Sequence, residues 1–290
     1  MAHPLPSRLP SLFISHGSPM TALEPREAGA FMAALGPAIE ARFGRPRAIL
    51  AVSAHSLART PLLFGAAQHP TVHDFSGFPD ALYRLRYDAP GAPALVPRVQ
   101  DLLAGAGIAV QASEAGGLDH GIWTPLRYMF PAADVPVLPL AFVPSASPVS
   151  LFALGEALAP LADDGVLVIG TGSLTHNLGL VFGSTRPPVD APERPDVRAF
   201  RAWVLERSAA RDWDALLDYR AQAPHAALMH PTDEHWLPFY VAAGAGGRDH
   251  PARRLHASLT FGSLAMDLYA FGASAAALAQ AAPESVAALA

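Results

Sequence analysis

The chain has 290 residues, of which 51% are hydrophobic, and a formal net charge of −5. This length and composition allow a substantial core in one large domain or two small ones. Because the charges are evenly spread, the sequence has no basic patch that would bind nucleic acid. The absence of cysteine excludes disulfides, thiolate nucleophiles, Cys-type zinc sites and iron–sulfur clusters. Any metal must therefore be held by nitrogen and oxygen atoms, for which the twelve histidines are candidates.

No stretch of the sequence is typical of a targeting or membrane segment. The first apolar run is too short for a signal peptide, and no uninterrupted apolar run approaches the roughly 18 residues that suggest a membrane span. We therefore expect a cytoplasmic protein that binds neither membranes nor nucleic acid. A homo-oligomer is compatible with these features.

Apolar periodicity predicts alternating strands and helices along the chain. Short apolar runs predict strands at residues 12–14, 48–53, 61–65, 108–111, 137–142, 165–170 and 255–261. Helical spacing predicts helices at residues 27–43, 94–105, 148–161, 197–207 and 213–219, a further helix through Trp123, and a proline-divided helical region at 225–244. The alternation predicts a single-domain α/β fold with a central, mostly parallel or mixed sheet flanked by helices on both faces. We expect this domain to span residues 10–270, followed by an Ala-rich tail at 274–290 that is a frayed helix or disordered.

Three of the predicted strands are each followed by a histidine. The three histidines are His16, His55 and His176. In open α/β sheets, ligands bind at the carboxyl ends of the strands, so parallel strands would bring these imidazoles to one edge. His120 follows Asp119 and His235 follows Glu234, which adds two further candidates. Imidazole nitrogens suit both zinc and ferrous iron. The residues alone also allow the alternative that each histidine is a hydrogen-bonded structural group, which is the commoner role of lone histidines near strand ends.

An ordered series of motifs resembles a known family over nearly the whole chain, from Leu12 to Met266. The motifs are His16-Gly17-Ser18-Pro19-Met20, Ser53-Ala54-His55, His73-Asp74-Phe75-x-Gly77-Phe78-Pro79, Asp119-His120-Gly121, Gly172-Ser173-x-x-His176-Asn177-Leu178, Pro231-Thr232-x-Glu234-His235-x-x-Pro238 and Gly262-Ser263-Leu264. Together they resemble the class III extradiol ring-cleavage dioxygenases, in the branch similar to DOPA 4,5-dioxygenase. No single motif is specific for this family, but the presence of all seven motifs in this order is.

The resemblance implies a non-haem metal site that opens onto a catechol pocket. By position, His16, His55 and His235 match the family's metal ligands, with Glu234 as a reserve candidate. His176 matches a residue that is either a general acid/base or a further metal ligand, and both roles stay open here. His120 matches a second active-site histidine near the substrate hydroxyls.

The implied reaction is cleavage of a catechol ring beside its diol with O₂, at one divalent metal ion per chain. Fe²⁺ would support turnover because it can donate electron density to O₂, whereas bound Zn²⁺ cannot change its oxidation state. Two alternatives use the same fold. One is a zinc hydrolase with Glu234 as base, and the other is a non-catalytic metal- or catechol-binding protein.

Several neighbours of these histidines have open roles. Phe75, Phe78 and Trp123 would either wall an aromatic pocket or pack in the core, and Asp74 and Asp119 would either orient histidines or close turns. The chain departs from the resemblance after His55, where Ser56 stands in place of a common tryptophan. This difference argues against DOPA as the substrate more strongly than it argues against the metal chemistry.

Overall fold

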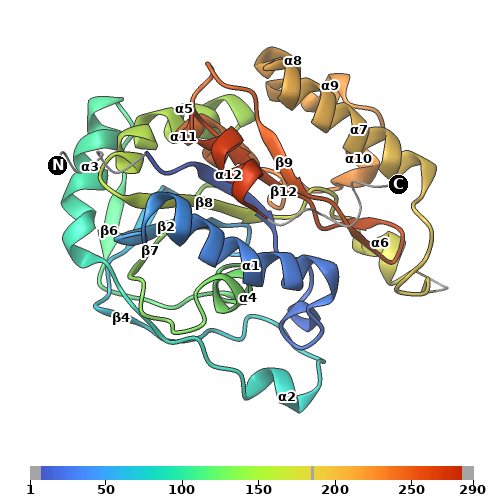
Figure 1. Cartoon of the computed structure of the whole chain (residues 1–290), viewed down its shortest axis with the longest axis horizontal. Helices are drawn as coiled ribbons and strands as arrows, with labels where there is room; N and C mark the ends of the chain where they lie inside the picture. The colour runs from blue at the N-terminus through green and yellow to red at the C-terminus, as the bar shows by residue number, and fades with distance from the viewer. Residues whose placement is uncertain (1–7, 184–185, 283–290) are drawn as a thin grey trace.

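The computed structural model describes residues 8–183 and 186–282 (Figure 1). The strands are β1 (Ser11–Ser15), β2 (Ala48–Ser53), β3 (Leu62–Phe64), β4 (Gln68–His69), β5 (Ala89–Pro90), β6 (Gln111–Ser113), β7 (Val137–Ala141), β8 (Val166–Gly172), β9 (Arg253–His256), β10 (Leu259–Thr260), β11 (Leu264–Ala265) and β12 (Leu268–Phe271). The α-helices are α1 (Arg26–Phe43), α2 (Asp80–Tyr83), α3 (Val96–Gly105), α4 (His120–Met129), α5 (Pro148–Leu158), α6 (Leu178–Val181), α7 (Pro195–Ala210), α8 (Trp213–Leu217), α9 (Tyr219–Gln222), α10 (Ala226–Met229), α11 (Pro238–Gly246) and α12 (Ala275–Ala281). Short 3₁₀ helices are η1 (Pro19–Ala22), η2 (Pro93–Leu95) and η3 (Ala159–Ala162).

A mixed sheet of eight strands forms the centre, in the order β6-β3-β7-β2-β8-β1-β12-β9. The four strands β7, β2, β8 and β1 run parallel to their neighbours in this series. On one side β3 pairs antiparallel with β7, and on the other β12 pairs antiparallel with β1. The parallel strands are buried along their whole length, as expected where both faces of the sheet are covered.

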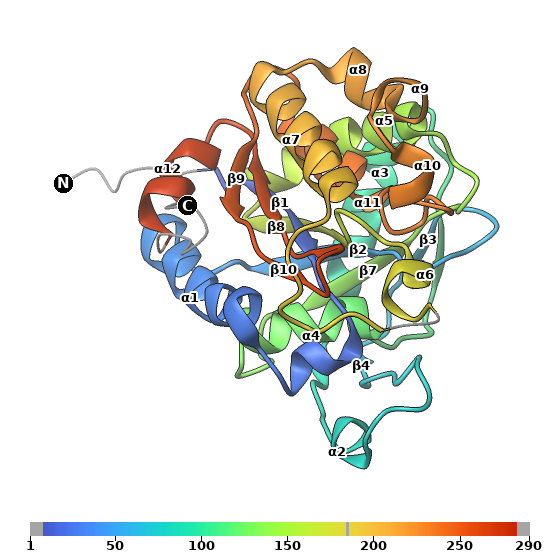
Figure 2. The same cartoon turned by 90° about the vertical axis from the view of Figure 1, so that its right-hand side faces the viewer.

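Helices cover both faces of the sheet (Figure 2). The strands send alternate side chains to the two faces. In β1, Phe13 joins a core with helices α5 and α11, whereas Leu12 and Ile14 join a core with α1, α4 and α12. This alternation follows from the two-residue period of a strand. The predicted α/β fold, its single domain and its mixed sheet covered on both faces are confirmed.

The structure differs from the predicted elements mainly near the end of the chain. The strand predicted at residues 255–261 is divided into β9 and the two-residue β10, and β6 begins where the strand predicted at 108–111 was expected to end. Strand β12 was not predicted, because four apolar residues between Asp267 and Gly272 are too few to show a period. Part of the predicted tail forms α12, with Leu278 buried, and residues 283–290 lie outside the described part. No helix within the described ranges is long and apolar enough to cross a bilayer.

Gly172, the last residue of β8, lets a distant segment pack directly on the strand. A Cβ atom at this position would lie closer than 3.0 Å to the backbone carbonyl oxygen of His235, a separation that real Cβ atoms do not show. The neighbouring Ser173 N–H donates a hydrogen bond of 2.9 Å to the same oxygen. The missing side chain therefore sets how close His235 comes to the sheet.

Replacing Gly172 by Ala is expected to lower the free energy of unfolding by about 1–3 kcal/mol, as for overpacked cores, because backbone atoms must move apart. Chemical denaturation of the metal-free protein measures this change. The matched control is Gly105→Ala, at the end of α3, where a new Cβ would meet nothing within 4 Å. Equal losses for the two variants would contradict the role given to Gly172.

Candidate metal centre

The carboxyl ends of three neighbouring parallel strands deliver three histidines to one edge of the sheet. His16 follows β1 directly, His55 follows β2 by two residues, and His176 follows β8 by four. Gly17 turns the chain just after His16 with a φ of +73°, a conformation that suits glycine. Two more histidines reach the same place from outside the sheet, since His120 begins α4 and His235 precedes α11.

The Nε2 atoms of His16, His55 and His235 converge on one point. The Nε2 of His55 lies 3.2 Å from that of His16 and 3.3 Å from that of His235. The three ring centroids are 5.1, 5.7 and 4.9 Å apart, and the ring planes are strongly inclined to one another. These values describe three rings that radiate from a common centre with their Nε2 atoms innermost.

The opposite ring nitrogens have partners that fix where the protons lie. The Nδ1 of His16 is 2.9 Å from the hydroxyl of Thr171, whose own proton is donated to the carbonyl oxygen of Gly121. The hydroxyl can therefore only accept, so His16 carries its proton on Nδ1 and has a lone pair on Nε2. The Nδ1 of His235 donates in the same way to the carboxylate of Glu234, at 3.0 Å.

For His55, Nδ1 lies 3.6 Å from an oxygen of Asp74, which favours the proton on that side too. Three lone pairs then face one another, and no arrangement of protons among them satisfies all three. A cation at their centre satisfies all three lone pairs. Nitrogen–metal bonds of about 2.0–2.1 Å in tetrahedral geometry place the donor atoms about 3.3–3.4 Å apart. The separations from the Nε2 of His55 to those of His16 and His235 match this value. The residues therefore fit a metal ion that takes imidazole ligands.

Burial keeps these imidazoles uncharged. It lowers the pKa of His16 well below the ordinary value, helped by the neighbouring His55, and it lowers the pKa of His55 to about 3. The pKa of His235 is also lowered by burial, although Glu234 acts against that shift. The hydrogen bond from His235 holds the pKa of Glu234 at about 2. Neutral imidazoles with free lone pairs are the form in which histidine binds metals.

His120 is oriented by Asp74, which lies in the loop before α2. Its backbone N–H donates to one carboxylate oxygen and its Nδ1 lies against the other, both at 2.9 Å. Burial would raise the pKa of Asp74, but these hydrogen bonds outweigh burial and lower it. The His120 ring lies 4.1 Å from that of His55, and His16, His55 and His120 also form a group whose ligand atoms lie within 4.8 Å of one another.

Asp119 forms a buried support behind His120. It receives hydrogen bonds from Ser53, at 2.7 Å, and from Ser56, at 2.6 Å, and it caps α4 through the N–H of Ile122. Burial raises its pKa, while the two serine hydrogen bonds act in the opposite direction. Ser56 therefore ties the segment after β2 to the start of α4.

His176 is arranged differently from the other four histidines. Its ring lies flat on that of His235, with centroids 3.4 Å apart and an angle of 8° between the planes. Two rings stacked in this way do not radiate from one centre as His16, His55 and His235 do. The ligand atoms of His176, Glu234 and His235 nevertheless lie within 4.8 Å of one another, as in the group of His16, His55 and His120. Burial, and secondly the neighbouring His235, lower its pKa to about 3.

A cavity of about 770 Å³ opens onto this cluster and is lined by four of the five histidines, all but His16. Its lining also includes the aromatic side chains Phe75, Phe78, Phe182 and Phe261. The Phe75 ring meets that of His120 edge-on, with centroids 5.7 Å apart. The cavity therefore offers an apolar, aromatic volume beside a polar floor of imidazoles, an arrangement typical of small-molecule sites.

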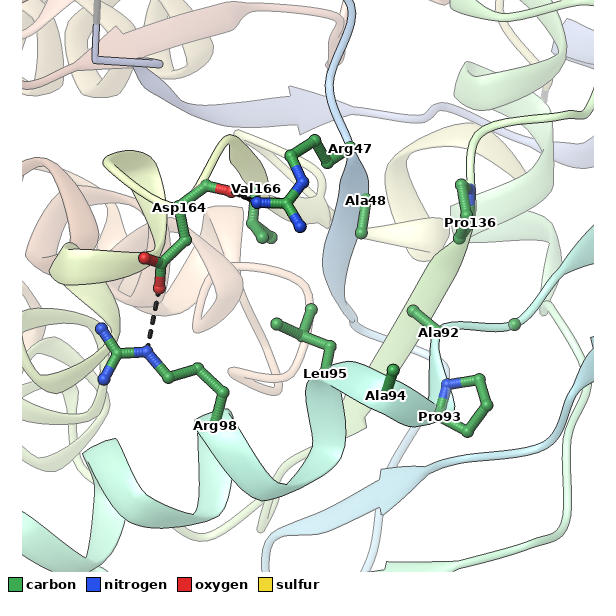
Figure 3. A pocket seen from close by; sticks show the side chains of 11 residues that line it. Arg47, Ala48, Ala92, Pro93, Ala94, Leu95, Arg98, Pro136, Asp164 and Val166 are labelled. Atoms are coloured by element: carbon green, nitrogen blue, oxygen red, sulfur yellow. Dashed lines mark hydrogen bonds and ion pairs between the residues drawn. The ribbon is translucent and has the colours of Figure 1, made fainter. Parts of the chain in front are cut away.

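A second hollow of about 490 Å³ lies at the opposite, amino-terminal ends of β2 and β8 (Figure 3). Arg98 donates to the carboxylate of Asp164 at 2.9 Å, and Arg47 donates to the carbonyl oxygen of the same residue. The remaining lining is small and apolar, and none of the lining residues is a histidine. The candidate metal centre therefore lies at the carboxyl-terminal edge of the sheet, away from this hollow.

The structure brings together all five histidines that the sequence singles out. Of the two roles expected for the aromatic residues, Phe75 and Phe78 have the first, because they line the cavity. Trp123 has the second, because it is fully buried in the core, where it donates to the carbonyl oxygen of Val72. His230, which matches none of the motifs, is fully buried and hydrogen-bonded to the carbonyl oxygen of Leu174 at 2.8 Å.

Thr171 was not predicted to contribute to the site, and the hydrogen bond of Ser56 to Asp119 was not predicted either. Their sequence signal is position, because Thr171 is one residue from the end of β8 and Ser56 follows the end of β2 by three residues.

Comparison with known proteins identifies the chain. Residues 10–272 match the family model described as the catalytic LigB subunit of aromatic ring-opening dioxygenase. The chain is 38% identical over 263 residues to a 4,5-DOPA dioxygenase extradiol of Beta vulgaris, covering 90% of this chain and 96% of the relative. It is 36% identical over 265 residues to the protein of that name in Escherichia coli K12, covering 90% and 93%.

The crystal structure of an uncharacterized protein from Escherichia coli K12 superposes with a TM-score of 0.73 at 28% identity, covering 91% of this chain and all of that one. The fold and relatives define an extradiol ring-cleavage dioxygenase, an oxidoreductase. The chain belongs to the LigB family of aromatic ring-opening dioxygenases, which confirms the resemblance drawn from the motifs.

Because His55 has a pKa of about 3 in the folded protein and about 6.5 when unfolded, the unfolded state binds more protons between these values. The stability of the metal-free protein is therefore expected to fall as the pH drops from about 6.5 towards 3. Urea denaturation across this range should show a shallower pH dependence for His55→Gln than for the parent. His250→Gln, which alters an exposed histidine, is the control, and equal slopes for the two variants would contradict the assignment.

Proposed function

We propose that this chain opens the ring of a catechol beside its diol with O₂, at one divalent metal ion held by His16, His55 and His235. The observation that carries the proposal is the convergence of three Nε2 lone pairs, with each Nδ1 turned to an acceptor. Three protein ligands leave coordination positions open for substrate and O₂. When bound, ferrous iron supplies the electron density that O₂ requires, and zinc does not.

The protein groups around the proposed ion have separate tasks. The aromatic wall that includes Phe75 holds the substrate ring and excludes water. His120, fixed by Asp74, lies on the cavity floor where the substrate hydroxyls would bind. Asp119 and its two serine partners keep His120 at the start of α4.

We assign His176 the role of general acid/base rather than of metal ligand. Its ring stacks on that of His235 instead of radiating from the centre, and it lines the cavity. Burial keeps it neutral, so it is free to accept a catechol proton, and an anionic substrate oxygen beside it would raise its pKa towards the working range. It can then return the proton to the opening ring.

A zinc hydrolase with Glu234 as base is less well supported. The carboxylate of Glu234 is occupied by Nδ1 of His235 and the hydroxyl of Thr232, both at 3.0 Å. Its low pKa makes it a weak base. Glu234 is better placed to orient His235.

The proposed activity is tested by anaerobic loading with Fe²⁺, followed by addition of a panel of catechols and O₂. A yellow ring-opened product and stoichiometric O₂ uptake are expected from the parent protein. His16→Ala removes one converging nitrogen and should abolish both metal retention and turnover. Absence of colour and of O₂ uptake across the panel would refute the dioxygenase assignment, and catechol binding without turnover would favour a binding protein instead.

His176→Ala should retain the metal but lose turnover by about 10²–10⁴-fold, the usual contribution of general acid–base catalysis. Elemental analysis and single-turnover kinetics of the iron-loaded variant separate these effects. His55→Ala is the matched comparison, because it removes a proposed ligand and should lose the metal. Loss of metal from the His176 variant would show instead that His176 is a ligand.

A further inference from the structure

The outer part of the cavity is built from segments that the proposed chemistry does not use. This part is lined by helix α6, by Arg186 and Val189, and by the turn between β10 and β11. Two large apolar side chains of this part, Leu178 and Phe182, are 53% and 57% exposed. Apolar side chains that face an open cavity in this way are available to contact a ligand.

Arg186 lies between two aromatic rings at this outer part. Its guanidinium carbon is 5.3 Å from the centre of the Phe182 ring and 4.9 Å from that of the Phe261 ring. Both distances are within cation–π range, so the rings hold the guanidinium in place. Within the described residues, no carboxylate lies at ion-pair distance from this guanidinium. The other arginine of the lining, Arg26, is paired with Glu24 at 3.1 Å.

Phe261 is held in a strained conformation that presents its ring to Arg186. Its φ is +58°, which is unfavourable for a bulky residue. Two hydrogen bonds to the preceding loop maintain this turn, one from Phe261 N–H to Val189 at 2.8 Å and one from Arg194 N–H to Gly262 at 3.0 Å. Strain that the surroundings enforce is concentrated at sites of function.

We propose that Arg186, held by Phe182 and Phe261, binds a carboxylate carried by the substrate, so that the enzyme selects catechols with an acidic side chain. The proposal rests on the function proposed above and names its substrate class. A guanidinium presents a planar fork of N–H donors that matches a carboxylate. The cavity of about 770 Å³ has room for a catechol that bears such a side chain.

The test compares two ligands that differ only in charge, 3-(3,4-dihydroxyphenyl)propanoate and its primary amide. With iron-loaded enzyme, Arg186→Met should raise KM for the acid about tenfold, as expected for one lost charge-assisted hydrogen bond. KM for the amide and kcat for both ligands should stay within about twofold. Arg186→Lys, which keeps the charge, should recover part of the affinity for the acid.

The matched control is Arg253→Met, which removes an exposed arginine of β9 that does not line the cavity. This control variant should leave KM and kcat for both ligands unchanged. Equal weakening of acid and amide by Arg186→Met would show a purely structural role, and unchanged KM values would also overturn the proposal.

Anaerobic calorimetry of the same two ligands separates this inference from the proposed reaction. Preferential binding of the acid, lost in Arg186→Met, supports the role of Arg186 even if no ring opening occurs. The preference should also weaken as ionic strength rises, because the contact is partly exposed. Equal affinities of the parent protein for acid and amide would refute the inference while leaving ring cleavage intact.

Discussion

The rest of the site depends on keeping a crowded group of histidines neutral. Two unit charges about 4 Å apart repel by about 4 kcal/mol even at an effective dielectric constant of 20, so neighbouring imidazoles at these distances cannot all be protonated. Thr171 and Glu234 accept from the Nδ1 of His16 and of His235, and Asp74 faces the Nδ1 of both His55 and His120. These contacts turn the Nε2 lone pairs of His16, His55 and His235 inward. Neutrality and proton placement thus follow from the same contacts.

The sheet explains why these rings meet at all. Parallel pairing of β1, β8 and β2 places the ends of the three strands side by side, so residues far apart in the sequence become neighbours. His235 does not follow a strand and depends on a backbone contact with the end of β8. One part of the centre is therefore set by strand pairing and another by the absence of a side chain at Gly172.

The sequence was sufficient for the fold class and for the histidines, because apolar periods and strand ends are local signals. His120 and His235 could be placed only through the order of motifs. The proton-fixing role of Thr171 and the stacking of His176 on His235 could not be predicted, since each depends on two segments meeting at a particular angle. The same limit applies to His230, whose burial is decided by the surrounding rings of Phe200, Tyr219 and Trp236.

The position of β12 beside β1 has a consequence for how the molecule is made. Within the described residues, the first strand, which leads into His16, is completed on one edge by the last strand, with Ser11 opposite Phe271. During synthesis β1 must wait with an open hydrogen-bonding edge until residues 268–271 have left the ribosome. Such distant pairing slows folding, and an open edge invites association with other chains. A prematurely ended chain would thus carry all five histidines and still expose the strand that positions the first of them.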